Sequence, residues 1–531
     1  QNVARFSVPG NVRYTRKIET IEEILDGLLK TISKFPRRGK LPRQILFYNT
    51  FRPGSGNSRM DELSLDICLA LGNNVVNGMP GWIDPGLARS RGLGFKQTSK
   101  MDVRSVGTEK LKQWATDLRK KGQWAYIKVI SLGDEIYLSG PKPGPETDVA
   151  FRAYLQNEGF EPSQILTDDP KFKELHRDQL WQEITYKLDT RETNPRLFYH
   201  GIKFRDQYGI DRLKERTDIL EKRLPEGVLI GANYSPHPFY WPHYRQWISV
   251  FRERAMTMPW SEDYLWQIAV TSQQVLGYIV SAFRNAARKH DLPIYMYVMP
   301  HTPGNTPASF RRAFYADVAH GAKYFDFFSP VPTAISYTEN NMLPESIDMY
   351  HAIYDVIRDA GTFEDIVFPG RVRPAQVGIL LSETTDIWNR SSLLNAERQH
   401  LYMALKHAQF PVDIVSEDDL IEDNLGSCRI LYLAVSHLSL KASRKLREWV
   451  RGGGYVFATA AAGLMDEYGR PNTEMQKLLG VSHAGEEIFE GRFWGKDNLP
   501  RLEKLDTIHY KLSFSADLAS LDVLLMKSIL R

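Results

Sequence analysis

Short runs of apolar, β-branched and aromatic residues recur along the first 330 residues, separated by segments with helical periodicity. This alternation is typical of a parallel α/β architecture, in which buried strands are connected by helices. An additional, weaker strand is expected between Leu93 and Val106, and helices are expected over 263–289 and 309–320. The clear strand candidates are 44–49, 74–77, 124–130, 228–233, 255–258, 294–298 and 323–328. We therefore predict a (β/α)8 TIM barrel over residues 1–373.

The pattern changes near residue 370, where Pro369, Gly370 and Pro374 interrupt the chain. A second α/β series follows, with strands at 376–381, 412–415, 429–435 and 455–458 and helices at 395–408 and 441–451. This spacing predicts a doubly wound domain over 374–480. The remaining residues, 481–531, are expected to form a short β-rich C-terminal segment. The predicted fold class is thus α/β throughout the two main domains.

Composition narrows the possible partners. The 531 residues are 42% hydrophobic and 25% charged, with a formal net charge of +4, so neither nucleic acid nor an acidic membrane surface is expected as a partner. No apolar run approaches the roughly 18 residues that cross a bilayer. The two cysteines, Cys68 and Cys428, provide neither a disulfide framework nor a cysteine-based metal cluster. We predict no cofactor and no metal site.

The cellular compartment is not determined by the sequence. The chain begins at Gln1 rather than Met, which indicates a removed leader or a trimmed chain. On that basis a secreted or periplasmic location is favoured over a cytoplasmic one.

The first candidate for chemistry follows the strand at 124–130. The chain there runs into Gly133, Asp134 and Glu135, which places two adjacent carboxyl groups at the mouth of the predicted barrel. A partly buried carboxyl at this position is suited to general acid catalysis on a glycosidic oxygen. The alternative is that Asp134 caps a following helix.

The second candidate covers two consecutive strand ends. Asn233 and Tyr234 follow one strand and precede a loop with His237 and Trp241, and the next strand leads to 260–264, which holds Trp260, Glu262 and Asp263. Aromatic rings beside carboxylates suit sugars, whose C–H faces stack on the rings while their hydroxyls bind polar groups. The alternatives are loop packing for the histidines and a favourable position at a helix N-terminus for Glu262. Metal binding is not favoured, because no histidine pair has metalloprotease-like spacing.

The third candidate follows the strand at 294–298. It opens into a Pro- and Gly-containing loop with His301 and Asn305, and no carboxylate lies there. His301 is retained as a candidate substrate-binding residue because it follows a barrel strand.

The order of these elements resembles the clan that holds the family 42 β-galactosidases among the glycoside hydrolases. Glu135 occupies the place of that family's acid/base, which ends the fourth barrel strand. Asn233 and Tyr234 resemble its Asn-Phe after the fifth strand, 260–264 resembles its Trp-Asp-x-Tyr after the sixth, and 319–322 resembles its Ala-His-Gly-Ala before the eighth. The segment 374–480 is similar to its flavodoxin-like trimerisation domain. The resemblance covers most of the chain through short motifs.

Two departures from this family pattern affect the expected chemistry. The family has Asn-Glu where this chain has Asp134-Glu135, and that Asn usually binds a 2-hydroxyl, so a different substituent or sugar is implied. The family's nucleophile ends the seventh strand, where this chain has Met299 and His301. Adjacent strands lie about 4.8 Å apart, so a carboxylate from the sixth strand can reach the same cavity. Glu262 is the first candidate nucleophile and Asp263 the second.

The resemblance implies a retaining β-glycosidase, β-galactosidase-like, with Glu135 as acid/base, acting on a carbohydrate; Glu262 is assigned as nucleophile by elimination. The residues expected to bind the substrate are Asp134, Asn233, Tyr234, His237, Trp241, Trp260, Asp263 and His301. The alternative is a catalytically inactive barrel that binds glycans or serves as an oligomeric scaffold. The resemblance also implies a homotrimer, in which Glu383 and Trp388 either reach a neighbour's pocket or merely end a strand and start a loop.

Overall fold

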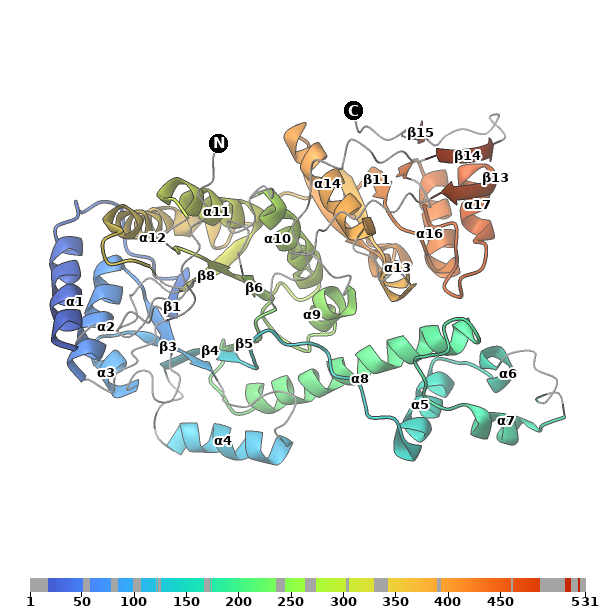
Figure 1. The fold of residues 1–531 in the computed structure, drawn as a ribbon, viewed down its shortest axis with the longest axis horizontal. Helices are drawn as coiled ribbons and strands as arrows, with labels where there is room; N and C mark the ends of the chain where they lie inside the picture. The colour runs from blue at the N-terminus through green and yellow to red at the C-terminus, as the bar shows by residue number, and fades with distance from the viewer. Residues whose placement is uncertain are drawn as a thin grey trace, which may run out of the picture.

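The computed structural model describes residues 18–50, 58–77, 85–98, 107–120, 122, 126–166, 172, 174–234, 244–262, 274–301, 305–328, 342–388, 393–459, 462–487, 511–516 and 524–525. Within these ranges the strands form two parallel sheets and one antiparallel pair. Figure 1 shows the part with the larger sheet in blue to yellow and the part with the smaller sheet in orange to red, side by side along the long axis.

The larger sheet has eight parallel strands in the order β5-β4-β3-β2-β1-β8-β7-β6. A parallel bridge between Tyr234 and Ser261 joins the two edge strands, β5 and β6, so the sheet closes on itself. Eight parallel strands in this closed order are what the predicted (β/α)8 barrel requires, and β3 is the strand expected between Leu93 and Val106. The strands are β1 (Leu46–Thr50), β2 (Val75–Asn77), β3 (Gly94–Thr98), β4 (Ile127–Ser131), β5 (Leu229–Gly231), β6 (Trp260–Glu262), β7 (Ile294–Val298) and β8 (Ala322–Phe328).

One barrel strand lies later in the chain than the apolar pattern predicts. The run 255–258 is buried but forms bends, and β6 begins at Trp260. Thr257 explains the difference, because its hydroxyl accepts a hydrogen bond from the Ile230 N–H while its own N–H donates to the Ile230 carbonyl, both at 2.8 Å. The run therefore attaches to β5 partly through a side chain, without regular strand pairing.

Helices cover the outside of the barrel. Helix α11 shows how the local sequence sets their ends: Thr306 caps it by accepting the Ser309 N–H at 3.1 Å, Pro307 occupies its first turn, and Gly321 ends it with φ of 110°. The barrel helices are α1 (Ile18–Ile32), α2 (Ser58–Leu71), α3 (Pro85–Ser90), α4 (Thr108–Lys120), α9 (Val250–Arg252), α10 (Gln274–Ala287), α11 (Pro307–His320) and α12 (Ile347–Val367), with a π-helix, η4 (Arg245–Ser249), directly before α9.

A helical insertion lies between β4 and β5, and the apolar pattern did not reveal it. It contains α5 (Pro145–Asn157), α6 (Pro162–Ile165), α7 (Arg177–Glu183) and the 27-residue α8 (Pro195–Glu221). Figure 1 shows α8 running from beneath the barrel to α5, α6 and α7. These helices have a hydrophobic cluster of their own, which includes Phe151, Trp181 and Phe204.

The smaller sheet is parallel and has the order β10-β9-β11-β12-β15. Numbered along the chain, this is the 2-1-3-4-5 order of flavodoxin-like doubly wound folds, so that prediction is confirmed. Its strands are β9 (Val377–Leu381), β10 (Val412–Ser416), β11 (Ile430–Leu433), β12 (Tyr455–Ala458) and β15 (Leu524–Leu525). Its helices are α13 (Glu383–Trp388), α14 (Leu393–His407), α15 (Glu417–Ile421), α16 (Leu440–Arg451) and α17 (Thr473–Leu479).

The C-terminal segment is partly built into this second sheet. Strands β13 (Val481–Glu487) and β14 (Lys511–Ala516) lie in the segment predicted to be β-rich and pair antiparallel. Strand β15, however, pairs in parallel with Phe457 and Ala458 of β12. The segment after residue 480 therefore supplies the fifth strand of the flavodoxin-like sheet and does not form a wholly separate unit.

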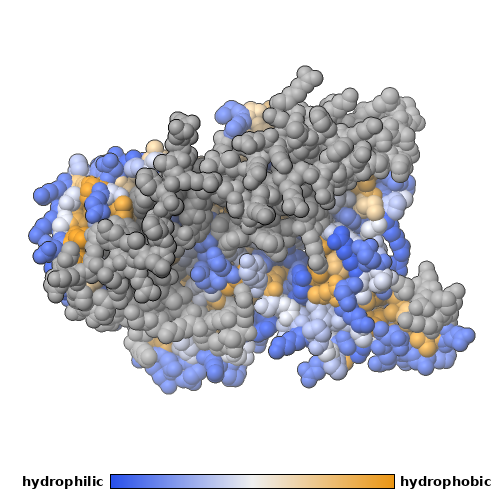
Figure 2. Space-filling model, in the orientation of Figure 1, coloured by the Kyte–Doolittle hydropathy of each residue, from blue (hydrophilic) through white to orange (hydrophobic). Residues whose placement is uncertain are grey.

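The barrel interior and the helix layer have distinct cores. The interior is filled by Val75, Val129, Met258, Trp260, Tyr295, Tyr297, Met299 and Tyr324, whereas a larger cluster lies between the strands and the helices. On the face shown in Figure 2, the coloured surface is mostly polar and the apolar residues show as small separate patches. None of the helices in the described ranges combines the length and the apolarity that a membrane span needs.

Candidate active site

The turn after β4 carries the first two candidate carboxyl groups. Glu135 is exposed and has φ of 46°, a left-handed conformation that non-glycine residues seldom adopt. Such strain persists only where the surrounding structure holds the backbone in place, and it is concentrated at functional sites. Glu135 therefore lies at the rim of the barrel mouth in an imposed geometry.

Hydrogen bonds to the end of β5 hold this turn. The Leu132 N–H donates to the Gly231 carbonyl at 2.7 Å, and the Asn233 N–H donates to the Gly133 carbonyl at 3.1 Å. The Ile136 N–H donates back to the Asn233 carbonyl at 3.2 Å. The backbone of Asn233 thus brackets the two carboxyl-bearing residues between its own donor and acceptor.

The side chain of Asn233 joins candidates from three strands. Its Nδ2 atom donates to Asp134 Oδ1 at 2.9 Å and to Glu262 Oε2 at 2.8 Å. Asn233 and Glu262 are buried, with 2% and 5% of their surfaces exposed. The ends of β4, β5 and β6 therefore converge, as the barrel architecture requires, and the structure brings Asp134, Asn233 and Glu262 together.

Glu262 is electrostatically unusual. The pKa of Glu262 is raised to about 8, chiefly by burial; the hydrogen bond from Asn233 lowers it, and the nearby carboxyl groups of Glu135 and Asp134 raise it. The carboxyl groups of Glu135 and Asp134 therefore lie within electrostatic reach of Glu262. A strongly shifted carboxyl in a group of carboxyls is a frequent property of acid–base sites.

Trp260 and Tyr234 do not present open faces to a substrate. Trp260 is 1% exposed, and its ring packs edge-on against Tyr295 at 4.7 Å and tilted against Tyr297 at 5.5 Å, inside the barrel beneath the mouth. Tyr234 is also 1% exposed and packs on Trp247 and Phe251 in the helix layer. The expectation that both contact substrate is corrected: successive side chains of a strand point to opposite faces, and Tyr234 faces outward.

The end of β7 holds a histidine in place of a carboxylate. His301 is fully buried, and its Nε2 lies 2.6 Å from the Phe328 carbonyl at the end of β8, to which it donates. Burial lowers the pKa of His301 to about 4, so the ring is neutral near neutral pH. His301 therefore lies at the same end of the barrel as Glu262, tied to the neighbouring strand.

Three candidates, His237, Trp241 and Asp263, lie outside the described residues. Among the residues that the structure does describe, no group of three or more His, Cys, Asp or Glu side chains could hold a metal ion.

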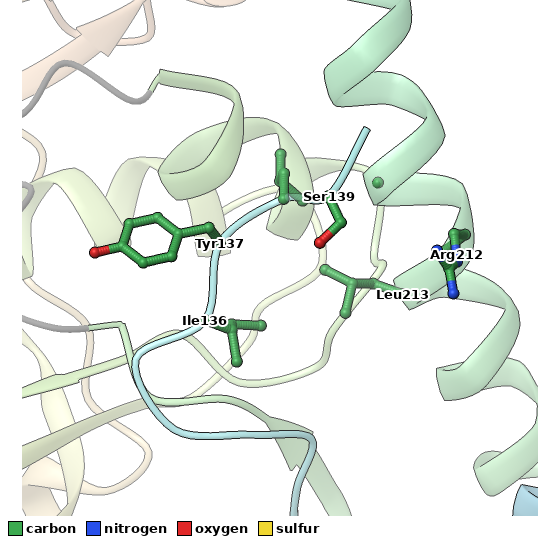
Figure 3. Close-up of a pocket in the computed structure, with 7 residues that line it drawn as sticks. Ile136, Tyr137, Ser139, Arg212 and Leu213 are labelled. Carbon is green, nitrogen blue, oxygen red and sulfur yellow. The ribbon is translucent and has the colours of Figure 1, made fainter. Parts of the chain in front are cut away.

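Tyr137 and Gln246 also lie at the candidate site, and neither was singled out from the sequence. Tyr137 is two residues after Glu135 and is 50% exposed. It belongs to a segment that lines a small cavity against α8, with Ile136, Ser139 and Leu213 (Figure 3). The Tyr137 ring points away from Arg212 and Leu213 in that view. An exposed aromatic beside a carboxyl is the signal that could have identified Tyr137, whereas Gln246 has no sequence signal.

Glu383 and Trp388 are engaged within their own chain. Glu383 is buried and forms ion pairs with Arg245 at 2.9 Å and Lys203 at 3.5 Å. Trp388 is buried, stacks on His437 at 5.3 Å and donates from its indole nitrogen to the Glu467 carbonyl. The expectation that these side chains reach a neighbour's pocket is therefore wrong for the chain as described, because intrachain partners already satisfy them.

The sequence matches no family model and no curated protein. Solved structures do match. A catalytic mutant of Gan42B, a family 42 β-galactosidase from G. stearothermophilus, has a TM-score of 0.67 at 15% identity, with 86% of this chain and 78% of that chain covered. The β-galactosidase from Bacillus circulans sp. alkalophilus has a TM-score of 0.64 at 14% identity, covering 85% and 77%.

A further match extends beyond β-galactosidases. The exo-β-1,4-mannosidase Op5Man5 from Opitutaceae bacterium strain TAV5 has a TM-score of 0.51 at 13% identity, covering 87% of this chain and 85% of that chain. At these identities the likeness concerns the fold. The chain therefore has the fold of the family 42 β-galactosidases and of related glycosidases, over both its barrel and its second domain.

Proposed function

We propose that the chain is a glycoside hydrolase that cleaves a β-glycosidic bond in an oligosaccharide or small glycoside. The observation that carries this proposal is the carboxyl group cluster at the barrel mouth, in which Asn233 binds both Asp134 and Glu262 and the Glu135 carboxyl acts electrostatically on Glu262. The solved structures with this fold include β-galactosidases and a β-mannosidase, which supports a β-linked sugar as substrate.

The positions of the two glutamates support distinct roles. Glu135 is exposed at the rim, where a leaving group departs, and suits the acid/base role. Glu262 is buried beneath, held by Asn233, and suits the nucleophile role. In the reactive form Glu135 holds a proton and Glu262 is ionised, so the proton that burial favours on Glu262 moves to Glu135 before attack.

The mechanism then takes two steps. Glu135 protonates the glycosidic oxygen while the Glu262 carboxylate attacks the anomeric carbon and forms a glycosyl ester. Glu135 next takes a proton from water, whose oxygen attacks the anomeric carbon and releases Glu262. This two-step route retains the anomeric configuration, and it requires the two carboxyl groups to lie about 5–5.5 Å apart, whereas inversion requires roughly 6.5–9.5 Å.

The neighbouring polar groups suit substrate binding. Asp134 stands where the resembling family has an asparagine that binds a 2-hydroxyl, and its carboxylate would accept a hydrogen bond from the sugar. Asn233 and His301 follow β5 and β7 at the same end of the barrel. His237, Trp241 and Asp263 remain candidates on the adjoining loops.

Two experiments test this function. A panel of aryl β-glycosides and natural oligosaccharides should contain at least one hydrolysed member, and a folded protein that turns over none of them would contradict the proposal. With an active substrate, azide should restore turnover to Glu262→Ala and yield the inverted glycosyl azide. A retained azide product would instead assign the acid/base role to Glu262.

A second candidate function is glycan binding without turnover. It is favoured by the β7 end, where Met299 and His301 occupy the place of the expected nucleophile. In that case Glu135→Gln would bind glycans as the unchanged protein does, and neither would hydrolyse them.

We also propose that the chain assembles as a homotrimer, on the resemblance of its second domain to a trimerisation module. Light scattering at micromolar concentration should give three times the chain mass, and the mass of one chain would contradict the assembly.

A further inference from the structure

A single buried amide contacts the backbone directly after Glu135. Gln246, which is 7% exposed and lies on η4, donates from Nε2 to the Ile136 carbonyl at 2.9 Å. Its Oε1 accepts the Leu138 N–H at 3.4 Å. The two ends of one side chain therefore bond the residues one and three positions beyond Glu135.

The same segment is confined on its other side by α8. A side chain at Gly209 would place its Cβ 3.0 Å from Leu138 Cβ and 3.2 Å from the Ser139 nitrogen, so the glycine allows α8 to approach this segment closely. With Asn233 bonding Gly133 and Ile136, the left-handed conformation of Glu135 is held from three directions. Gln246 lies on η4, and the second domain holds the start of η4 in place.

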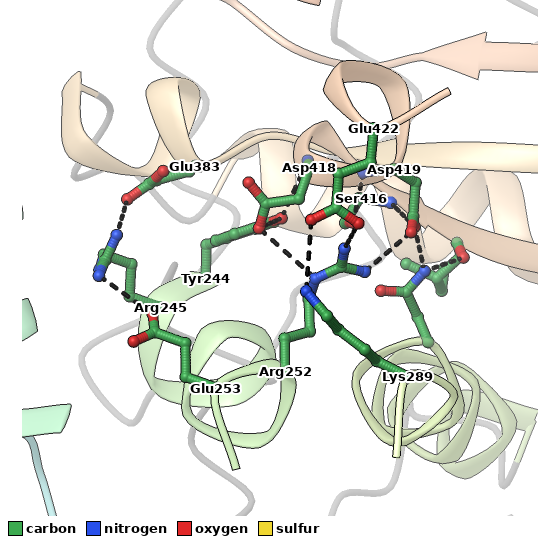
Figure 4. A network of polar contacts seen from close by, with 12 residues as sticks. Tyr244, Arg245, Arg252, Glu253, Lys289, Glu383, Ser416, Asp418, Asp419 and Glu422 are labelled. Atoms are coloured by element: carbon green, nitrogen blue, oxygen red, sulfur yellow. Dashed lines mark hydrogen bonds and ion pairs between the residues drawn. The ribbon is translucent and has the colours of Figure 1, made fainter. Parts of the chain in front are cut away.

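The residues before Gln246 bind the second domain. Arg245 donates from Nη1 to Glu383 Oε1 at 2.9 Å, and Glu383 also pairs with Lys203. Tyr244 donates from its N–H to Asp386 Oδ2 at 3.0 Å and from its hydroxyl to Asp418 Oδ2 at 3.1 Å. Figure 4 shows Tyr244 and Arg245 reaching from η4 toward the helices that carry Glu383 and Asp418.

The wide turn of the π-helix η4 sets the positions of Tyr244, Arg245 and Gln246. The Val250 N–H donates to the Arg245 carbonyl, five residues back, which defines the π-helix. Three consecutive residues thus divide their contacts: Tyr244 and Arg245 bind the second domain, and Gln246 binds the Glu135 turn. The ion pair is persistent, because burial opposes the charge of Glu383 but Lys203 and Arg245 outweigh it and lower its pKa.

We propose that Gln246 is a positioning residue that fixes the orientation of Glu135, and that the second domain holds Gln246 in place through Glu383 and Asp386. The effect on turnover rests on the proposed function, whereas the effect on the turn does not. The second domain then acts on the active site of its own chain, whatever the oligomeric state.

The direct test compares two buried amides. Gln246→Leu removes both hydrogen bonds to the turn, and Asn285→Leu is the matched control. Asn285 is buried on α10, and its Nδ2 donates to the Ile414 carbonyl and Asp419 without touching the turn. Hydrogen–deuterium exchange of the full chain should show faster exchange over 132–138 in Gln246→Leu alone. Equal exchange there in both variants would overturn the proposal.

Kinetics add a readout that lost stability does not move. With an active glycoside, Gln246→Leu should lower kcat by about tenfold to a hundredfold with little change in KM, since a misplaced acid slows proton transfer. Asn285→Leu should keep both constants. An unchanged kcat in Gln246→Leu would also overturn the proposal. A wild-type chain that hydrolyses nothing would contradict the proposed function, and the exchange measurement alone would then decide the inference.

The remote arm uses Glu383→Gln, with Asp419→Asn as its control. Asp419 lies in the same interface and accepts a hydrogen bond from Arg252 at 2.8 Å. Arg252 belongs to α9, so this contact does not involve η4. Faster exchange over 132–138 is expected in Glu383→Gln and not in Asp419→Asn. Because these variants keep the size of the side chains, they also serve if Gln246→Leu does not fold, and equal exchange in the two would refute the role of the second domain.

Discussion

Asn233 donates to Glu262 at 2.8 Å, and this hydrogen bond opposes the effect of burial on the Glu262 carboxyl. Both residues are buried, so the bond is poorly screened by solvent. The ionised form of Glu262 therefore depends on one neighbouring amide.

Replacing that amide should raise the pKa of Glu262 above its present value of about 8. In Asn233→Ala, the basic limb of the kcat/KM profile should move to higher pH, and kcat/KM should fall by about a hundredfold because Asp134 and Glu262 are no longer aligned. The pH–rate profile measures both effects. A limb that stays in place would show that Glu262 is not the titrating group.

The unusual Glu262 also makes stability depend on pH. Its folded-state pKa of about 8 lies above the ordinary value of 4.5, so the folded state binds the proton more strongly than the unfolded state. This contribution is fully present below about pH 4.5 and is lost as the pH rises toward about 8. Denaturant unfolding of wild type and Glu262→Gln should show this decline in wild type, and a smaller one in the variant.

His301→Glu tests whether the missing β7 carboxylate matters. We expect no gain in turnover and a loss of about 1–3 kcal/mol in unfolding free energy, because the hydrogen bond to Phe328 is broken and a carboxyl is buried. Activity assays and chemical denaturation measure the two effects. Turnover that appears only in His301→Glu would support the glycan-binding alternative for the natural chain.

Tyr137 is expected to stack on the sugar or aglycone at the rim. Tyr137→Ala should raise KM several-fold with kcat nearly unchanged, since an exposed ring contributes about 0.5–1.5 kcal/mol of contact. Tyr137→Phe, which keeps the ring, is the control and should retain the wild-type KM. Equal KM values in all three proteins would exclude this contact.

The interface between the domains contains a buried ion pair between Arg252 and Asp419, at 2.8 Å. Arg252→Met leaves the Asp419 charge without its cation and should lower the unfolding free energy by about 3–5 kcal/mol. Arg371 pairs with Asp291 at the surface, and Arg371→Met should change the unfolding free energy by less than about 1 kcal/mol. Urea titrations of the two variants compare them directly.

The sequence was sufficient to predict the convergence of Asp134, Asn233 and Glu262, because strand ends follow from apolar runs and parallel barrel strands bring their ends together. It was not sufficient for Tyr234 and Trp260. Their neighbours in the chain suggested sugar contacts, but Tyr234 packs on Trp247 and Phe251 in the helix layer. Trp260 packs on Tyr295 and Tyr297 inside the barrel, and neither orientation can be read from the local sequence.

Polar contacts between residues far apart in the chain could not be predicted from the sequence either. Glu383 pairs with Arg245, 138 residues away, and no local pattern marks either residue as a partner. The sequence analysis also missed the insertion with α5–α8. The barrel was identified from its strands, and this insertion contains none in the described residues. Its helices pack on each other and on the second domain.

The bridge between Tyr234 and Ser261 closes the barrel between β5 and β6, and Asn233 and Glu262 are the adjoining residues on either side of it. The carboxyl cluster therefore cannot assemble in a chain whose strands have formed but whose barrel has not closed. Recovery of hydrolysis during refolding should follow the last tertiary step and lag behind the recovery of helix content, so that catalysis itself reports when the barrel has closed.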